Sequence, residues 1–225
     1  MLNALVNLFF PKVCLTCLFR LADNEEYLCT SCRHKLPLTN YHLTKDNFVS
    51  KLFYGRAKIE NGTALLKFEK KGITQKLIHQ LKYKEQQQVG TFLGAWLGKE
   101  LNDCGDYSTV DIVIPVPLHK KKLRSRGYNQ VSKFGIEIAT AINANYVDNV
   151  LIKITNTESQ VTKNRFSRWD GKNDLFTIHN LDQIQGKHIL LIDDIITTGA
   201  TLEACILELN KAKNIKISIA TMAIA

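Results

Sequence analysis

The residues best suited to chemistry are two adjacent carboxylates, Asp193 and Asp194, which follow the apolar run "HILLI". An apolar run of this length that ends in charged residues predicts a buried strand with both acids at its carboxyl end. Two like charges this close raise each other's proton affinity, and their burial is costly unless a cation or ligand hydroxyls compensate. The pair therefore predicts a binding partner at the end of the strand.

The residues after the acid pair predict a phosphate site. Thr197, Thr198 and Gly199 are expected to form a tight turn before a helix over 201–213. The N–H groups and positive dipole end of a helix N-terminus favour a phosphate, and a glycine permits close backbone approach. The carboxylates could hold ribose hydroxyls, a metal ion or both, so a ribose phosphate fits the two halves together.

A P-loop nucleotidase is the main alternative, because its acidic strand also consists of apolar residues followed by Asp. That fold additionally requires the motif G-x-x-x-x-G-K-[ST]. The Gly-Lys pairs that begin at Gly98, Gly171 and Gly186 are followed by Glu, Asn and His respectively. The sequence therefore excludes the nucleotidase interpretation.

Two C-x-x-C pairs near the start of the chain predict a metal site formed by Cys14, Cys17, Cys29 and Cys32. Two such pairs complete a tetrahedral sulfur site, and a reducing compartment disfavours disulfides. Neither pair opens a helix of a thioredoxin-like unit. We therefore expect a structural Zn²⁺ in a small ribbon-like module over residues 1–45, with the main domain over 46–225.

Composition favours an anionic ligand and a location in the cytoplasm. Lys and Arg together number 30 against 21 Asp and Glu, and the net charge of +9 favours phosphate esters or nucleic acid, although solubility alone could also explain it. The apolar run over 2–9 is too short to span a bilayer and is expected to form a docking helix. We predict a cytoplasmic protein without a transmembrane segment.

Before residue 110, the pattern predicts a hairpin and two helices. Alternating residues on either side of Asn61-Gly62 predict strands over 51–59 and 62–69. Helical periodicity is expected over 73–83 and 89–101, and Trp96 of the second helix is assigned to the core.

From residue 110 onward, strands alternate with helices. Strands are expected over 109–114, 149–155, 186–193 and 215–225, and a helix over 129–142. This alternation predicts an α/β fold with a parallel sheet, whose ligands bind beyond the carboxyl ends of the strands. The basic loop over 115–126 lies at one such end, and the polar stretch over 157–174 is typical of a lid.

The segment "LLIDDIITTGAT" resembles the phosphoribosyl-pyrophosphate loop of type I phosphoribosyltransferases. The chain as a whole resembles the ComF family, which is associated with bacterial competence and DNA uptake. The resemblance includes the four-cysteine module, "LIHQLKYK" (77–84), "IPVPLHKKKLRSRGYNQ" (114–130), and the set Ser159, Gln160, Arg165 and Arg168.

The resemblance implies a type I phosphoribosyltransferase-like fold, a parallel sheet with flanking helices, with a zinc-ribbon-like module added. It implies that phosphoribosyl pyrophosphate binds with Mg²⁺, and that Asp193 and Asp194 hold the ribose hydroxyls directly or through the metal. It assigns the 5-phosphate to the turn residues Thr197, Thr198, Gly199, Ala200 and Thr201. It places Arg124 or Arg126 at the departing pyrophosphate, and Arg165 and Arg168 in the lid.

Two functions compete on these grounds. The first is an enzyme that transfers ribosyl phosphate to an unidentified acceptor, with Thr197 in place of a third acid arguing against purine salvage. The second is a non-catalytic module of the DNA-uptake machinery that binds single-stranded nucleic acid through Lys120, Lys121 and Lys122. Aromatic side chains near basic residues could then stack on bases, namely Tyr83, Tyr128 and Trp169.

Overall fold

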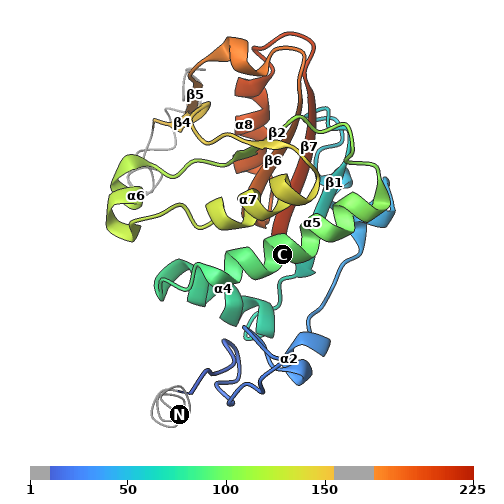
Figure 1. Cartoon of the computed structure of the whole chain (residues 1–225). Coiled ribbons are helices and arrows are strands. Elements are labelled where there is room, and N and C mark those ends of the chain that lie inside the picture. Colours follow the sequence, from blue (N-terminus) through green and yellow to red (C-terminus); the bar gives the residue numbers. More distant parts are fainter. Residues whose placement is uncertain (1–10, 155–174) are drawn as a thin grey trace.

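The computed structural model describes residues 11–154 and 175–225 (Figure 1). The helix expected over 2–9 and the lid expected over 157–174, with Arg165 and Arg168, lie outside the described residues.

A five-stranded parallel sheet forms the centre of the molecule, with the strand order β1-β7-β6-β2-β3. Its strands are β1 (Gly62–Lys67), β2 (Ile112–Pro115), β3 (Asn145–Tyr146), β6 (His188–Ile196) and β7 (Lys216–Ile224). Apolar residues line both faces of the central strands, as parallel sheets covered on both sides require. The predicted α/β class is confirmed.

Different elements cover the two faces of the sheet (Figure 1). One face packs against α4 (Ile73–Tyr83), α5 (Gln88–Cys104) and α7 (Ser132–Ala141). The other packs against α8 (Ala200–Leu209) and a separate antiparallel pair, β4 (Leu151–Lys153) with β5 (Phe176–Ile178). Side chains of β6 alternate between these faces, so consecutive residues of this strand meet different surroundings.

Glycines bring the first helical layer close together. A Cβ added at Gly94 of α5 would lie 2.5 Å from the carbonyl oxygen of Phe134 in α7, and one at Gly98 would lie 2.8 Å from the Ala141 Cβ. Side chains at these positions would therefore force the two helices apart. Leu93, Leu97 and Leu101 of α5 are fully buried beside this contact.

The predicted hairpin over 51–69 is wrong. The first of its two segments begins within a short helix, α3 (Phe48–Leu52), while the second forms β1, which pairs in parallel with β7. Val49 and Phe53 are both buried and are spaced four apart, as on one helical face. Asn47 caps α3 by accepting a hydrogen bond from Ser50 N (3.1 Å) and ties it to β1 by donating to Gly62 O (2.7 Å).

Other predicted elements keep their type but change in length or position. The helix over 73–83 is confirmed, while β6 continues three residues past the predicted end because β7 pairs with it as far as Ile224. The strand predicted over 149–155 lies outside the main sheet as β4, and the short edge strand β3 was missed. The basic loop contains a helix, α6 (Lys120–Arg126), which ends at Gly127 with φ +81°.

The cysteine-rich segment packs against α4 and α5, the helices that also cover one face of the sheet. It contains α2 (Thr30–His34), and its residues Leu21, Leu28 and Leu36 join the core cluster of α4 and α5. The following residues run antiparallel to the outer edge of β1, with Thr39 N donating to Leu65 O at 3.1 Å. Two 3-10 turns, η1 (Tyr41–Leu43) and η3 (Leu181–Ile184), complete the described elements. None of the helices in the described ranges has the length and apolar character needed to cross a bilayer.

Candidate active site at the carboxyl ends of the strands

The acid pair lies on the central strand β6, just beyond the point where its neighbour β2 ends. The last residue of β2, Pro115, pairs with Ile192, and beyond that point β6 continues to pair with β7, with Asp193 opposite Thr221. The chain order of the strands also reverses between β2 and β6. Open α/β sheets bind their ligands beyond the carboxyl ends of the strands at such a position.

Asp194 has its compensating partners within the chain. The Asp194 side chain is 8% exposed, and its Oδ2 accepts hydrogen bonds from Lys82 Nζ (2.9 Å) and Gln130 Nε2 (2.7 Å). Gln130 in turn accepts a hydrogen bond from Arg126. The inference that the pair must be compensated from outside the chain is therefore wrong for Asp194, because α4 supplies a buried ion pair.

Asp193 lies in different surroundings. It is half-buried, it neighbours Asp194 on the alternate face of the strand, and its Oδ1 accepts a hydrogen bond from the Asp194 N–H at 2.8 Å. Burial, followed by the adjacent charge of Asp194, raises the pKa of Asp193 above the ordinary range for Asp. The Asp194 N–H and the charges of Lys82 and Lys153 only partly oppose this effect. Of the two acids, Asp193 is therefore the one that a cation or ligand hydroxyls would stabilise most.

The expected phosphate-binding turn is present between β6 and α8. Gly199 has φ +75° and precedes the first residue of the helix, Ala200. The side chains of Thr197, Thr198 and Thr201 are exposed around this helix N-terminus. The structure thus brings the predicted turn residues together at the N-terminus of α8, where the Ala200 N–H donates a long hydrogen bond (3.4 Å) to the Thr198 hydroxyl.

Arg56 holds the turn and was missed by the sequence analysis. Its guanidinium donates hydrogen bonds to Thr198 O (2.8 Å) and Leu52 O (3.1 Å) and pairs with Glu203 in the first turn of α8. Phe53 lies under the turn, because a Cβ at Gly199 would be 3.2 Å from its ring. Arg56 and Thr198 are 142 positions apart, so no local pattern could have linked them.

A groove with a volume of about 490 Å³ opens between the end of α4 and α6. Its lining includes Lys82, Lys121, Lys122 and Arg126, with Glu85 as the acidic residue, and we call it the basic groove. The Arg126 guanidinium lies 5.9 Å from the ring centroid of Tyr83. Lys82 belongs both to this groove and to the ion pair with Asp194, so the groove adjoins the acid pair.

The structure separates the two arginines that were predicted to face a leaving group. Arg126 lines the basic groove and reaches Asp194 through Gln130, whereas Arg124 is exposed on α6 and is not among the lining residues. The geometry therefore favours Arg126 over Arg124 as the group next to the acid pair.

The four predicted zinc ligands form one cluster. The Sγ atoms of Cys14, Cys17, Cys29 and Cys32 lie within 4.8 Å of one another, and the Cys17–Cys29 pair is 3.8 Å apart. A tetrahedral Zn–S site with bonds of about 2.3 Å has sulfur–sulfur edges of about 3.8 Å. Burial opposes ionisation of Cys14, but hydrogen bonds from Thr16 and from backbone N–H groups outweigh it and lower its pKa. The cluster therefore fits a metal such as zinc.

Comparison with known proteins defines the class. A family model described as "Phosphoribosyl transferase domain" matches residues 127–224, which include the acid pair, the turn and α8. Together with the parallel sheet and flanking helices, this match defines a phosphoribosyltransferase-like domain. Lys82 and Arg56, which contact Asp194 and the turn, both precede the matched region.

Similar proteins carry names that refer to DNA utilization or to competence. The chain is 26% identical over 130 residues to the DNA utilization protein YhgH of Shigella flexneri, covering 56% of each chain. It is 24% identical over 130 residues to Competence protein F of Haemophilus influenzae, covering 56% of this chain and 57% of the relative. It is 32% identical over 107 residues to Competence protein ComFC of Bacillus subtilis, covering 46% of this chain and 41% of the relative.

These matches support the predicted resemblance of the chain to the ComF family. The matched part spans about half the length of these curated relatives.

Proposed function

We propose that this chain binds phosphoribosyl pyrophosphate with Mg²⁺ at the carboxyl ends of β2 and β6 and transfers the ribosyl phosphate to an acceptor, in a role linked to competence. The observation that carries the proposal is the joining of an acid pair, a phosphate-type turn and a basic groove at one edge of the sheet. Each matches one part of that ligand: the ribose hydroxyls, the 5-phosphate and the pyrophosphate.

In this proposal the turn binds the 5-phosphate. The N–H groups of Gly199, Ala200 and Thr201 and the hydroxyls of Thr197 and Thr198 serve as donors, since this end of α8 is open and its threonines are exposed. Arg56 donates a hydrogen bond to the Thr198 carbonyl oxygen, so this acceptor of the turn is already satisfied and does not compete with the phosphate for donors.

The two acids take unequal parts. Asp193 is the primary acceptor for ribose hydroxyls, because Oδ2 of Asp194 already accepts two hydrogen bonds. Carboxylate oxygens are donors that Mg²⁺ prefers, so the pair fits the metal. When bound with the substrate, Mg²⁺ would supply neutralisation of the pyrophosphate charge.

The basic groove stabilises the leaving group. Negative charge grows on pyrophosphate as its bond to the ribose carbon breaks, and fixed cations placed there lower the barrier. Lys82 and Arg126 are the groove cations connected to the acid pair, and Arg124, Arg165 and Arg168 remain candidates from the family resemblance. We also retain the division into a zinc module over 1–45 and a transferase-like domain over 46–225.

Calorimetric titration of phosphoribosyl pyrophosphate with Mg²⁺ tests this proposal. Wild type is expected to bind, and Asp193→Asn to bind roughly 100-fold more weakly, since hydrogen bonds to a charged group are lost. Asp182→Asn is the matched control, because this exposed acid in η3 precedes the amino end of β6. Absence of binding by wild type, or equal binding by Asp193→Asn, would contradict the proposal.

Single-stranded nucleic acid is a second candidate ligand, favoured by the basic groove itself. Tyr83 is 67% exposed at the rim of this groove beside Lys121 and Arg126, so a base could stack where a phosphate is neutralised. A fluorescent thymidine 12-mer should then bind with an affinity that falls steeply with salt, and Lys121→Ala should reduce the slope. Salt-insensitive binding would rule out this mode.

A further inference from the structure

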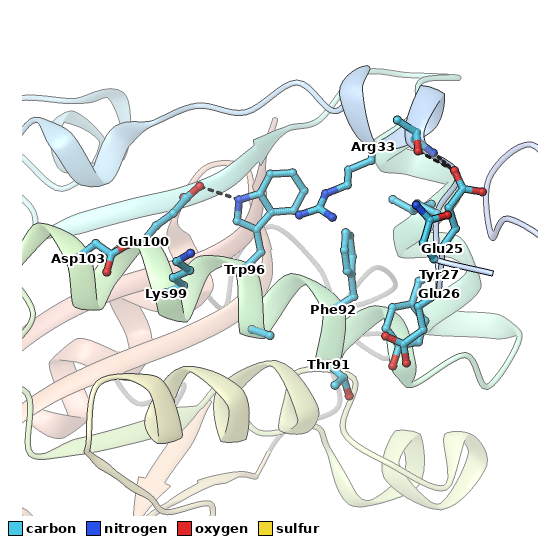
Figure 2. A pocket seen from close by; sticks show the side chains of 14 residues that line it. Glu25, Glu26, Tyr27, Arg33, Thr91, Phe92, Trp96, Lys99, Glu100 and Asp103 are labelled. Carbon is cyan, nitrogen blue, oxygen red and sulfur yellow. Dashed lines mark hydrogen bonds between the residues drawn. The ribbon is translucent and has the colours of Figure 1, made fainter. Parts of the chain in front are cut away.

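A second and larger groove lies between the cysteine-rich segment and α5, far in sequence from the acid pair. It has a volume of about 870 Å³ and an open mouth (Figure 2). Residues 24–33 form one wall, and residues of α5 between Thr91 and Asp103 form the other. We call it the acidic groove, and it shares no lining residue with the basic groove.

Aromatic rings form the floor of the acidic groove. Phe92 and Trp96 of α5 meet edge to face with centroids 5.7 Å apart, and Tyr27 lies 5.8 Å from Phe92. All three are partly exposed, so Trp96, which was assigned to the core, packs against the core cluster from its edge and is not fully buried. The apolar stripe of α5 is wider than the surface that covers it, and its edge faces this groove (Figure 2).

The rings already accept a guanidinium group. Arg33 of α2 reaches across the groove, and its Cζ lies 5.0 Å from the Trp96 centroid and 6.0 Å from the Phe92 centroid (Figure 2). Trp is the best ring for cation–π contacts, and Arg is the cation most often found in them. The floor is therefore a surface on which a planar cation packs favourably.

Carboxylates surround this floor. Glu25, Glu26, Glu100 and Asp103 line the groove against two cations, Arg33 and Lys99. Hydrogen bonds from backbone N–H groups of Ala22 and Thr30 lower the pKa of Glu25, so its charge is fixed. A local excess of negative charge is notable on a chain with a net charge of +9, since it must repel nucleic-acid phosphates and attract cations.

We propose that the acidic groove binds an arginine- or lysine-bearing segment of a protein partner. One guanidinium or ammonium group of the segment packs on the exposed aromatic rings beside Arg33, while other cations of the same segment pair with Glu26 at one end of the groove and with Asp103 at the other. Aromatic residues are enriched in the centres of protein interfaces, and charge complementarity selects the partner. This inference is independent of the phosphoribosyl pyrophosphate proposal, because it uses none of the same residues.

The test uses an arginine hexapeptide and the indole N–H signal of Trp96 in ¹H–¹⁵N NMR spectra. Trp96 Nε1 donates to Glu100 Oε1 at 2.7 Å inside the groove, so its signal reports occupancy there. The chain has two tryptophans, and Trp169→Phe leaves this one signal. A glutamate hexapeptide and a thymidine 6-mer serve as comparison ligands at the same ionic strength.

We expect the arginine peptide alone to shift the Trp96 signal, and Glu26→Gln/Asp103→Asn to weaken its binding roughly 2- to 30-fold, as the loss of two exposed ion pairs predicts. Both side chains are exposed, so the double variant should fold, and Asp182→Asn/Asp148→Asn is a control of equal charge. No shift up to millimolar peptide would overturn the proposal. A shift caused by the thymidine 6-mer would also overturn it, in favour of nucleic acid.

Discussion

The basic and acidic grooves share one kind of contact, an arginine over an aromatic ring, but differ in the charge of the residues around it. In each, an arginine lies over an aromatic ring: Arg126 over Tyr83 at 5.9 Å, and Arg33 over Trp96 at 5.0 Å. In the basic groove the arginine has lysine neighbours, whereas in the acidic groove it has carboxylate neighbours. The charges that sum to +9 are therefore unevenly distributed between the two grooves. Among the described residues, the basic groove is lined by four cations and one carboxylate, whereas the acidic groove is lined by four carboxylates and two cations.

The grooves also differ in what builds them. The acidic groove depends on the cysteine-rich segment for one wall, while the basic groove depends on α4, α6 and the buried Lys82–Asp194 pair. Each can therefore be damaged while the other is left intact, and the following changes are ordered from the largest expected effect to the smallest.

Removal of the metal should destroy the acidic groove alone. Structural zinc sites contribute on the order of 10 kcal/mol to folding of small modules, so Cys14→Ser should unfold the wall that carries Glu25 and Glu26. Elemental analysis should find one zinc per wild-type chain and less in the variant, with arginine-peptide binding lost and phosphoribosyl pyrophosphate binding retained. Cys104→Ser, outside the cluster, is the control. Full zinc content in Cys14→Ser would contradict the four-cysteine site.

Loss of Lys82 should damage the basic groove and the stability of the sheet end. Lys82→Met leaves Asp194, with 8% of its side chain exposed, without its cation, and breaking a buried pair costs about 3 kcal/mol. Urea denaturation at pH 7 measures this loss, and Lys82→Arg should restore most of it. A change below about 0.5 kcal/mol would mean that the pair is effectively solvated.

Neutralisation of Asp193 should stabilise the fold, in contrast to the loss of Lys82. Burial and the charge of Asp194 raise the pKa of Asp193 to about 8 in the folded state. Between its unfolded pKa of about 4 and this value the native chain binds more protons than the unfolded chain, so the wild-type free energy of unfolding falls as the pH rises. Asp193→Asn should thus match wild type near pH 4 and exceed it by at least about 1 kcal/mol at pH 8. Denaturation curves at both pH values check this. A variant less stable than wild type at pH 8 would contradict the raised pKa of Asp193, because the charged form would then stabilise the fold.

Removal of a surface charge on α6 should have the smallest effect on stability, but it should weaken the binding of phosphoribosyl pyrophosphate. Lys121→Ala should change the unfolding free energy by less than about 0.5 kcal/mol, because the side chain is exposed. It should nevertheless weaken phosphoribosyl pyrophosphate binding severalfold, whereas Lys99→Ala in the acidic groove should leave it unchanged. Equal effects of the two substitutions in calorimetry would show that only net charge matters.

The sequence predicted the parts of this molecule that local patterns determine. Buried apolar runs identify β6 and β7, and the spacing of four cysteines identifies their cluster, since both depend on neighbours in the chain. The period of two in a strand even implies that Asp193 and Asp194 face different sides, although we interpreted them as one site.

Contacts between distant residues account for what could not be predicted. Arg56 meets Thr198 across 142 positions, and Gln130 meets Asp194 across 64, so nothing local marks either residue. The partial exposure of Trp96 was missed for a related reason: periodicity reveals an apolar stripe on α5 but not how much of it the rest of the chain covers.

Hydrogen–deuterium exchange with and without phosphoribosyl pyrophosphate and Mg²⁺ tests the central claim most directly, because it locates the ligand on the chain. We predict slower exchange over residues 193–201 and 120–128, where the turn and α6 meet the ligand, and no change over 24–33 and 91–103 in the acidic groove. Protection confined to the acidic groove, or none at saturating ligand, would contradict the account.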